Sequence, residues 1–355
     1  MSVEMQHRLW AVDADCGAAR GASPPGMRPE RLLRLMRKSI IACALDLRGR
    51  TVLTEAASGP YVVTPVLAAL AGARVTAVTR TTRLGRAEDI RRNTLALAEL
   101  GGVADQITIT SDHPAALVGD VDIVTNSGHV RPIDANVVSA MRAGCVVALM
   151  YEAWEIQAGR FDVDLDALNE RGVAYAGTNE RHPAVDVFSY LGLMAVRLLL
   201  DAGIAPYGAR IAVLCDNPFA SYLIRGLEGA GATVVCNSSL DELLSSPAPE
   251  ALVVALQPTG LPLIAITEAI RIKAVWPHVL IAQFWGDIDR QAIEQVGLGV
   301  WPERDPAPGH MAVLPSDVGP EPVVRLQTGG LKVGQVLLTP RHRRSAADLE
   351  YIDEL

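Results

Sequence analysis

The chain has 355 residues, of which 50% are apolar, 5% aromatic and 20% charged, and its net charge is −8. This length suggests two domains whose cores are built mainly from aliphatic side chains. The acidic balance argues against nucleic acid or an anionic membrane as the main partner, since both attract basic surfaces. No apolar stretch reaches the roughly 18–20 residues that a membrane span needs, and the N-terminus lacks a signal-peptide pattern. We therefore expect a cytoplasmic protein.

The first half of the chain is predicted to contain an N-terminal arm and a Rossmann-like domain. Residues 1–50 combine a turn-rich stretch at 21–26 with a helix over 30–46, and the domain covers 51–185. Its strands are expected at 51–56, 74–79, 106–110, 122–126, 145–150 and 172–177, with helices at 61–72, 86–100 and 134–144. Repeated strand–helix–strand units indicate parallel pairing.

A mostly apolar helix over 186–203 is predicted to connect this domain, through the segment 186–206, to a second Rossmann-like domain at 207–310. Its strands are expected at 210–215, 232–236, 251–256 and 279–284, with helices at 219–230 and 262–275. Residues 311–355 are expected to dock back on one of the domains. The predicted fold class is α/β, with two doubly wound parallel-sheet domains joined by a long helix.

The cysteines carry no metal chemistry that we can identify. The five of them are scattered, without the spacing of a metal site, so we predict reduced thiols and no metal. Cys145 and Cys215 lie in apolar runs and are expected to be core residues.

Ligands of open α/β sheets bind beyond the carboxyl ends of the strands, where the strand order reverses. The first strand is followed by EAASGPY (55–61), in which Ser58 and Gly59 would let a phosphate approach a helix N-terminus. The second is followed by TRTTR (79–83), in which Arg80, Thr81 and Arg83 could hold a 2′-phosphate. These stretches favour NADP or NAD as the cofactor. A tight turn without a ligand and a solvated basic loop explain them as well.

Three further loops are predicted to lie side by side at the same edge: 126–134, 151–155 and 178–183. The cofactor-binding candidates among them are Asn126, Ser127 and Gly128. The substrate-binding candidates are Arg131, Arg181, Asn179, Glu155 and Trp154. His182 or His129 is expected to be the general acid/base, because imidazole titrates near neutral pH, and Glu180, Glu152 or Glu155 would orient it. Any one of these residues could instead be a salt-bridged structural group.

Two stretches resemble known families. The stretch 122–168, which contains DIVTNSGHVRPIDANVVSAMRAGCVVALMYEAWEI and FDVDLDAL, resembles the cofactor domain of adenosylhomocysteinases and D-2-hydroxyacid dehydrogenases. VTRTTRLGRAEDI (78–90) resembles the NADP-binding turn of shikimate-dehydrogenase-like enzymes. The resemblance covers about residues 50–180 and implies a two-domain Rossmann-type protein that binds NAD(P). The catalytic residues of those families have no counterpart here, so none is carried over.

The leading hypothesis is an NAD(P)-dependent oxidoreductase that acts on a small polar, anionic carbonyl or imine compound in a cleft between the domains. One alternative is an S-adenosylmethionine-dependent methyltransferase-like enzyme, supported by Glu55 and the small residues after it. Another is a non-redox lyase or ligand sensor with the same cleft, because fold alone does not give function. The apolar runs at 186–203 and 331–338 permit a homodimer. The sequence DNPFASY (216–222) replaces a glycine loop in the second domain, which is therefore not expected to bind a dinucleotide in the usual way.

Overall fold

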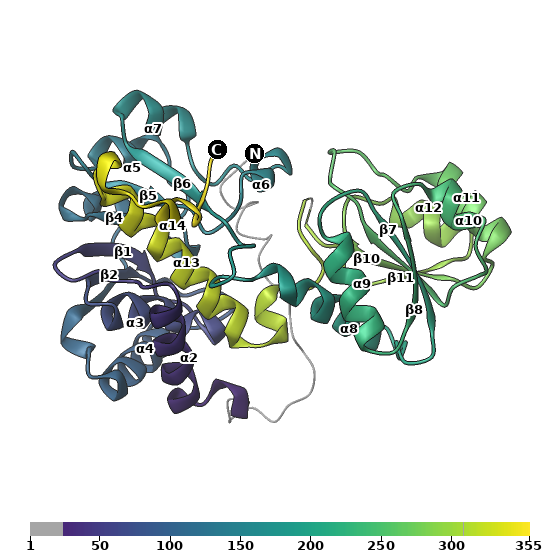
Figure 1. The fold of residues 1–355 in the computed structure, drawn as a ribbon, viewed down its shortest axis with the longest axis horizontal. Helices are drawn as coiled ribbons and strands as arrows, with labels where there is room; N and C mark the ends of the chain where they lie inside the picture. The colour runs from purple at the N-terminus through teal and green to yellow at the C-terminus, as the bar shows by residue number, and fades with distance from the viewer. Residues whose placement is uncertain (1–23, 308) are drawn as a thin grey trace. The chain divides into compact units, whose positions relative to one another are not determined.

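The computed structural model describes residues 24–307 and 309–355, so most of the predicted N-terminal arm, 1–23, lies outside the described residues. The chain forms two compact units, which are coloured along the chain in Figure 1. Of the described residues, the first contains 24–153, Phe161–Asp186 and Gly319–Leu355. The second contains Trp154–Arg160 and Val187–Val318.

The first unit is built on a seven-stranded sheet in the order β12-β6-β5-β4-β1-β2-β3. Its strands are β1 (Thr51–Glu55), β2 (Arg74–Val78), β3 (Ile107–Thr110), β4 (Ile123–Thr125), β5 (Val146–Ala148), β6 (Ala174–Thr178) and β12 (Ile352–Asp353). β12 pairs antiparallel with β6, and all other pairs are parallel. The six predicted strands are confirmed, and their order is that of a Rossmann domain, with the switch point between β1 and β4.

Helices cover both faces of this sheet (Figure 1). They are α2 (Pro29–Ala42), α3 (Val63–Leu70) after the 3-10 turn η3 (Gly59–Val62), α4 (Ala87–Gly101), α5 (Ala135–Ala140), α7 (Leu165–Arg171), α13 (Pro320–Leu338) and α14 (Ala346–Leu349). The sequence did not assign α13, because the glycines of TGGLKVG (328–334) are poor helix formers in isolation. A Cβ at Gly334 would lie 2.7 Å from Ile123 Cγ2, so a missing side chain lets α13 pack closely on the sheet. The C-terminal segment therefore docks on the first unit.

The second unit contains a five-stranded parallel sheet in the order β11-β10-β9-β7-β8. Its strands are β7 (Arg210–Cys215), β8 (Thr233–Asn237), β9 (Ala251–Ala255), β10 (Leu280–Trp285) and β11 (Gly299–Trp301). Its helices are α6 (Trp154–Gln157), α8 (Leu191–Asp201), α9 (Ala220–Gly229), α10 (Leu240–Leu244), α11 (Ile266–Val275) and α12 (Arg290–Gln295). This strand order is that of flavodoxin-like sheets, which also bind ligands at a switch point, here between β7 and β9.

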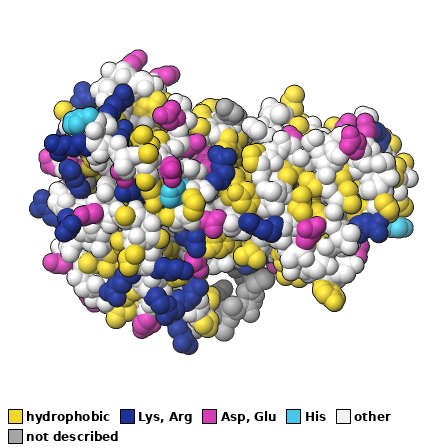
Figure 2. All heavy atoms as spheres, in the orientation of Figure 1, with side chains coloured by type: hydrophobic (Ala, Val, Ile, Leu, Met, Phe, Trp, Pro, Cys, Tyr) yellow, Lys and Arg dark blue, Asp and Glu magenta, His cyan; other side chains and the backbone are white. Residues whose placement is uncertain are grey.

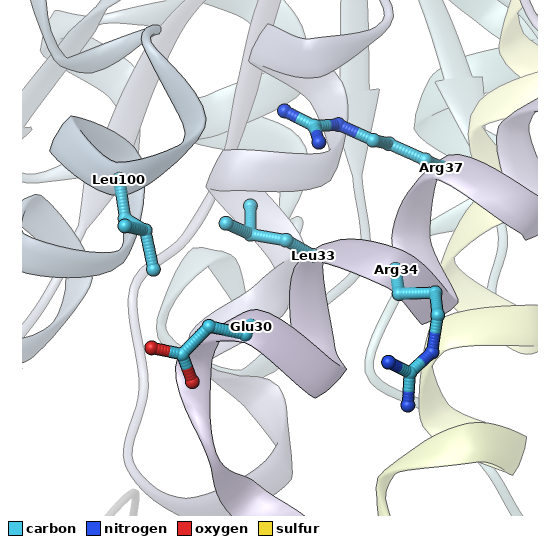
Figure 3. Close-up of a pocket in the computed structure, with 5 residues that line it drawn as sticks. All are labelled: Glu30, Leu33, Arg34, Arg37 and Leu100. Carbon is cyan, nitrogen blue, oxygen red and sulfur yellow. The ribbon is translucent and has the colours of Figure 1, made fainter.

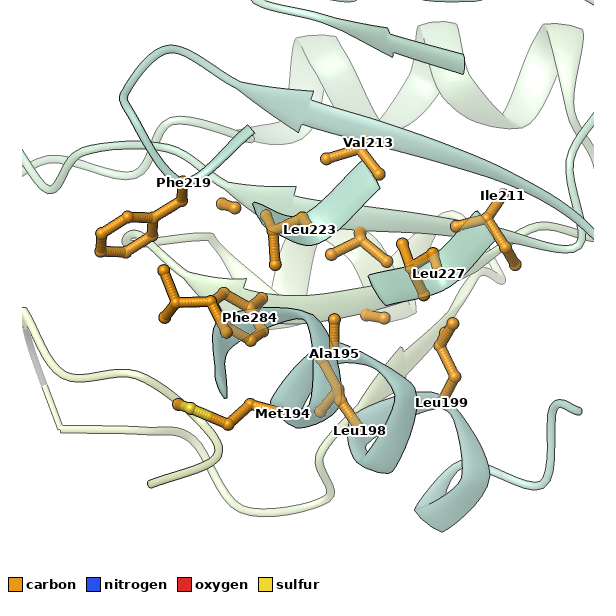
Figure 4. Packing of buried hydrophobic residues seen from close by; sticks show 14 of the residues in the cluster. Met194, Ala195, Leu198, Leu199, Ile211, Val213, Phe219, Leu223, Leu227 and Phe284 are labelled. Atoms are coloured by element: carbon orange, nitrogen blue, oxygen red, sulfur yellow. The ribbon is translucent and has the colours of Figure 1, made fainter. Parts of the chain in front are cut away.

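Helix α8, which the sequence placed as a connector, packs in the core of the second unit. Leu198 and Leu199 of α8 face Leu223 and Leu227 of α9, beneath the apolar side chains of β7 (Figure 4). The helix begins at Leu191 and not at 186, because Asp186 has a φ of 46°, which no right-handed helix accommodates. Among the described residues, none of the helices combines the length and apolar character of a membrane span.

The crossing of α8 and α9 yields a stability prediction. A Cβ at Gly226 would overlap Gly192 Cα, so Gly226→Ala must force the helices apart. We expect a loss of about 1–3 kcal/mol in the free energy of unfolding, measured by urea denaturation. Gly229→Ala is the matched control, because nothing lies within 4 Å of a Cβ there. Equal effects of the two substitutions would contradict this packing.

Candidate functional site

The loops that follow β2, β1, β4, β5 and β6 form a continuous row at the carboxyl edge of the first sheet. The bonds that link neighbouring loops are Ser58 Oγ to Leu84 O (3.1 Å), Thr54 Oγ1 to Ser127 Oγ (3.1 Å), Met150 N to Asn126 Oδ1 (2.7 Å) and Glu180 N to Glu152 Oε1 (2.9 Å). The structure therefore brings together most of the sequence-predicted residues in one unit. They divide into a group at the switch point and a group around β6.

The switch point contains a buried carboxyl group. Glu55, the last residue of β1, is 5% exposed, and its Oε2 lies so close to Gly128 that a Cβ there would overlap it. The backbone N–H of His129 donates to the carboxylate, and Arg131 attracts it. Burial outweighs both effects and raises the pKa of Glu55 to about 7. A group with such a pKa can exchange a proton at neutral pH.

Two buried polar atoms in the loops on either side of β1 have no hydrogen-bond partner. They are Thr79 Oγ1, which follows β2, and Asn126 Nδ2, which follows β4; the residues are 4% and 1% exposed. Leu53 of β1 pairs with Val124 of β4. Two residues further along both strands, the same register places Asn126 beside Glu55. Unpaired buried polar groups are rare in folded proteins, and a bound water, an ion or a functional role can account for them.

Beneath them, three buried hydroxyl groups fix the spacing of β1 and β4. Thr125 Oγ1 lies 2.8 Å from Thr54 Oγ1 and 2.6 Å from Ser127 Oγ. Ser127, expected to bind the cofactor, is thus engaged within the sheet. The cluster gives the switch point a rigid floor.

The basic turn after β2 is partly structural. Thr81 Oγ1 accepts from Ala87 N at the start of α4, and Thr82 and Gly85 exchange backbone bonds in a tight hairpin. Arg80 is half-buried and Arg83 is exposed. Among the described residues, the ion pairs of this region are Arg86–Glu88 and Arg92–Asp89, and they involve neither Arg80 nor Arg83.

The loop after β4 carries His129 and Arg131 on either side of Val130 of the 3-10 turn η7 (Gly128–Val130). Arg131 Nη1 lies 2.8 Å from Asp162 Oδ2, with both side chains largely buried. The carboxylate of Asp162 balances the charge of Arg131. Burial therefore has a larger effect on the pKa of Glu55 than the attraction by Arg131.

The loop after β6 uses its polar groups within the protein. Buried Glu152 accepts from the Glu180 backbone and pairs with Arg181 Nε at 3.3 Å. Asn179 donates from its backbone to Tyr351 O and from Nδ2 to Glu350 O, both in the C-terminal tail. The tail reaches β6 as strand β12 and therefore orders this loop.

His182 is engaged on three sides. Its Nδ1 accepts from Ala184 N at 3.1 Å, and its ring stacks on Tyr351 with centroids 3.8 Å apart. Nε2 lies 3.9 Å from Glu350 Oε2. Burial lowers the pKa of His182, with Glu350 opposing the shift, so the neutral form is favoured. These contacts are those of a structural histidine.

Trp154 and Glu155 belong to the second unit. The Trp154 ring packs edge-on against Phe219 and Trp285, with centroids 5.6 and 5.0 Å apart, and Glu155 pairs with Arg160. Their role as substrate contacts stays a prediction.

The second unit fills its own switch point with side chains. Asn217 Nδ2, after β7, donates to Ala255 O at the end of β9 (2.7 Å), and Asp216 Oδ1 accepts from Gln257 N (2.9 Å). A phosphate would need backbone N–H groups in this place. The expectation that this domain does not bind a dinucleotide in the usual way stays a prediction.

A pocket of about 380 Å³ lies on the outer side of α2 and α4, lined by Glu30, Leu33, Arg34, Arg37 and Leu100 (Figure 3). Figure 2 shows dark-blue basic side chains gathered over α2. None of these lining residues comes from the loops described above. Within the described ranges, no group of His, Cys, Asp and Glu is placed to hold a metal ion.

The sequence assigned Glu55 a role only in the methyltransferase alternative. It did not predict that the C-terminal tail contacts the loop after β6. A signal for Glu55 existed, because a carboxylate ends the otherwise uncharged strand TVLTE and small residues follow it. Tyr351 had no such signal, since its contact with His182 joins residues far apart in the chain.

No protein-family model matches the sequence, and no curated protein matches it. Among solved structures, a dipicolinate synthase chain from Bacillus subtilis is similar, with 11% identity, 83% of this chain and 97% of that chain covered, and a TM-score of 0.52. A dipicolinate synthase chain from Bacillus halodurans shares 12% identity over 83% and 100% of the chains, with a TM-score of 0.49. A D-lactate dehydrogenase from Treponema pallidum shares 13% over 84% and 98%, with a TM-score of 0.47. The first of these and the strand orders confirm a two-domain Rossmann-type fold.

The contacts of His182 predict its effect on stability. His182→Ala should lower the free energy of unfolding by about 1–3 kcal/mol, because it leaves the Ala184 N–H without an acceptor and removes the stack on Tyr351. His113→Ala is the matched control: its Nδ1 also accepts from the N–H two residues on, but it is exposed to water. An unchanged melting temperature in His182→Ala would show that the imidazole has no structural role.

Proposed function

We propose that the chain is an NAD(P)-dependent oxidoreductase whose cofactor binds at the switch point of the first unit. The observation that carries this proposal is the pair of unpartnered buried groups, Thr79 Oγ1 and Asn126 Nδ2, on either side of β1 in a sheet with the full Rossmann strand order. A ligand rich in hydrogen-bond acceptors would satisfy both groups.

The residues present fit a nicotinamide dinucleotide in most respects. Small residues, Ala56, Ala57, Ser58 and Gly59, follow β1 and leave room for its phosphates. Arg80 and Arg83 follow β2, where an NADP 2′-phosphate is usually held, which favours NADP over NAD. Glu55 is the feature that a phosphate site would not ordinarily contain.

The remaining roles in the proposal follow from position. The nicotinamide supplies hydride transfer when bound. His129, half-exposed beside Gly128, is our candidate for proton transfer to a small polar carbonyl or imine, since His182 is engaged by Ala184 and Tyr351. Arg131 and Arg181 would hold an anionic group of the substrate, and Glu152 and Asn179 keep Arg181 and its loop in place. Glu155 and Trp154 remain proposed substrate contacts, and the homodimer remains a prediction.

The second candidate is an S-adenosylmethionine-dependent enzyme. Glu55 favours it, because a carboxylate at the end of β1 suits a cationic ligand better than a phosphate. A non-redox lyase or sensor has no specific contact in its favour.

Ligand binding tests the proposal. We expect NADPH to raise the melting temperature, as a ligand of the folded state must, and S-adenosylmethionine to leave it unchanged. Arg80→Ala should raise the Kd for NADPH at least about tenfold, because it removes a charged phosphate contact, and should alter the Kd for NADH little. Both constants would be measured by isothermal titration calorimetry.

Arg91→Ala provides the control, since Arg91 is exposed on α4 in the same basic stretch. It should bind both nucleotides as the wild type does. If none of NAD, NADH, NADP and NADPH changes the melting temperature, the proposed function is wrong.

A further inference from the structure

A carboxyl group occupies the crevice where a dinucleotide site usually presents only backbone. Glu55 spans from the end of β1 to Gly128, beyond the end of β4, and accepts from the backbone of His129. It is buried at the point where α/β sheets bind their ligands. Any molecule bound there would contact it.

The charges around Glu55 are few. The elements packed against β1 are β2, β4, η7 and α3. Their charged or titratable side chains are Arg74, at the opposite end of β2, and His129; Arg131 follows η7 and is paired with Asp162. Arg131 attracts the Glu55 carboxylate and lowers its pKa, but burial outweighs this attraction and raises the pKa to about 7.

We propose that Glu55 is a specificity-determining residue that admits the phosphates of the nucleotide only as the neutral acid, donating its O–H to them. This inference rests on the proposed function. An ionised carboxylate would repel a phosphate strongly at this depth, whereas the acid provides a donor. Asn126 Nδ2, beside Glu55 in the register of β1 and β4, points to the same ligand chemistry, since it can donate and has no acceptor.

The test is the Kd for NADH between about pH 6 and about pH 8.5, measured by titration calorimetry in two buffers of different ionisation enthalpy. NADH serves as the probe because its phosphodiester charges do not change in this range. We expect the wild-type Kd to rise about tenfold per pH unit above about pH 7, with uptake of close to one proton on binding. Glu55→Gln keeps a donor that never ionises, so its Kd should stay flat.

His129→Asn is the control for the other titratable group, and the pH dependence should persist in it. Proton uptake by the wild type reports the same coupling without any variant, should Glu55→Gln fold poorly. Equal pH profiles of wild type and Glu55→Gln overturn the inference and leave the proposed function standing. If no nicotinamide nucleotide binds either protein at any pH, both are overturned. Binding of S-adenosylmethionine that strengthens as pH rises would also overturn the inference, because it requires an ionised Glu55.

Discussion

The first unit depends on a helix that enters it from the far end of the chain. α13 lies on β4, β5 and β6 through Gly329, Gly330 and Gly334, whose lack of side chains permits close contact. Lys332 is 4% exposed in this helix, and its ammonium is held by Asp348 at 3.1 Å and faces the Tyr351 ring. A buried charge is tolerated only with such partners. The helix thereby fixes the tail against the sheet.

The anchoring of the C-terminal tail explains why the polar loops after β5 and β6 differ from those at the switch point. Because the tail is anchored, Tyr351 and Glu350 supply the acceptors and the ring that engage the loop after β6, while Asp353 accepts from Ala153 N at 2.5 Å. The loops after β5 and β6 are therefore largely satisfied by the protein itself. Among the loops at this sheet edge, those after β2 and β4 contain buried donors without a partner, Thr79 Oγ1 and Asn126 Nδ2, which favours the switch point as the candidate site.

The sequence was sufficient for the fold class and for every strand except the short edge strands β11 and β12, because apolar β-branched runs between turn signals, alternating with helical periodicity, indicate a parallel sheet. The sequence did not predict α13, because glycine usually disfavours a helix. In this structure the glycines of α13 instead allow the helix to pack closely on the sheet. For the site, the sequence pointed to the carboxyl edge of the first sheet and ranked His182 above Glu55, whereas the contacts of His182 are structural. The stack of His182 on Tyr351 is a long-range contact that no local pattern encodes.

Glu55 lowers the free energy of unfolding at neutral pH, and this loss of stability favours a functional role for the residue. A pKa raised from 4.5 to about 7 means that the stability present below about pH 4.5 is lost as pH rises toward 7, by an amount of about 3 kcal/mol. A glutamine of the same shape would avoid this loss, and the crevice would still be filled. A buried, strongly perturbed carboxyl group at a ligand-binding position is more often functional than structural. The scaffold thus provides the place for a nucleotide, and on our proposal the side chain at the end of β1 sets the protonation state in which it can bind.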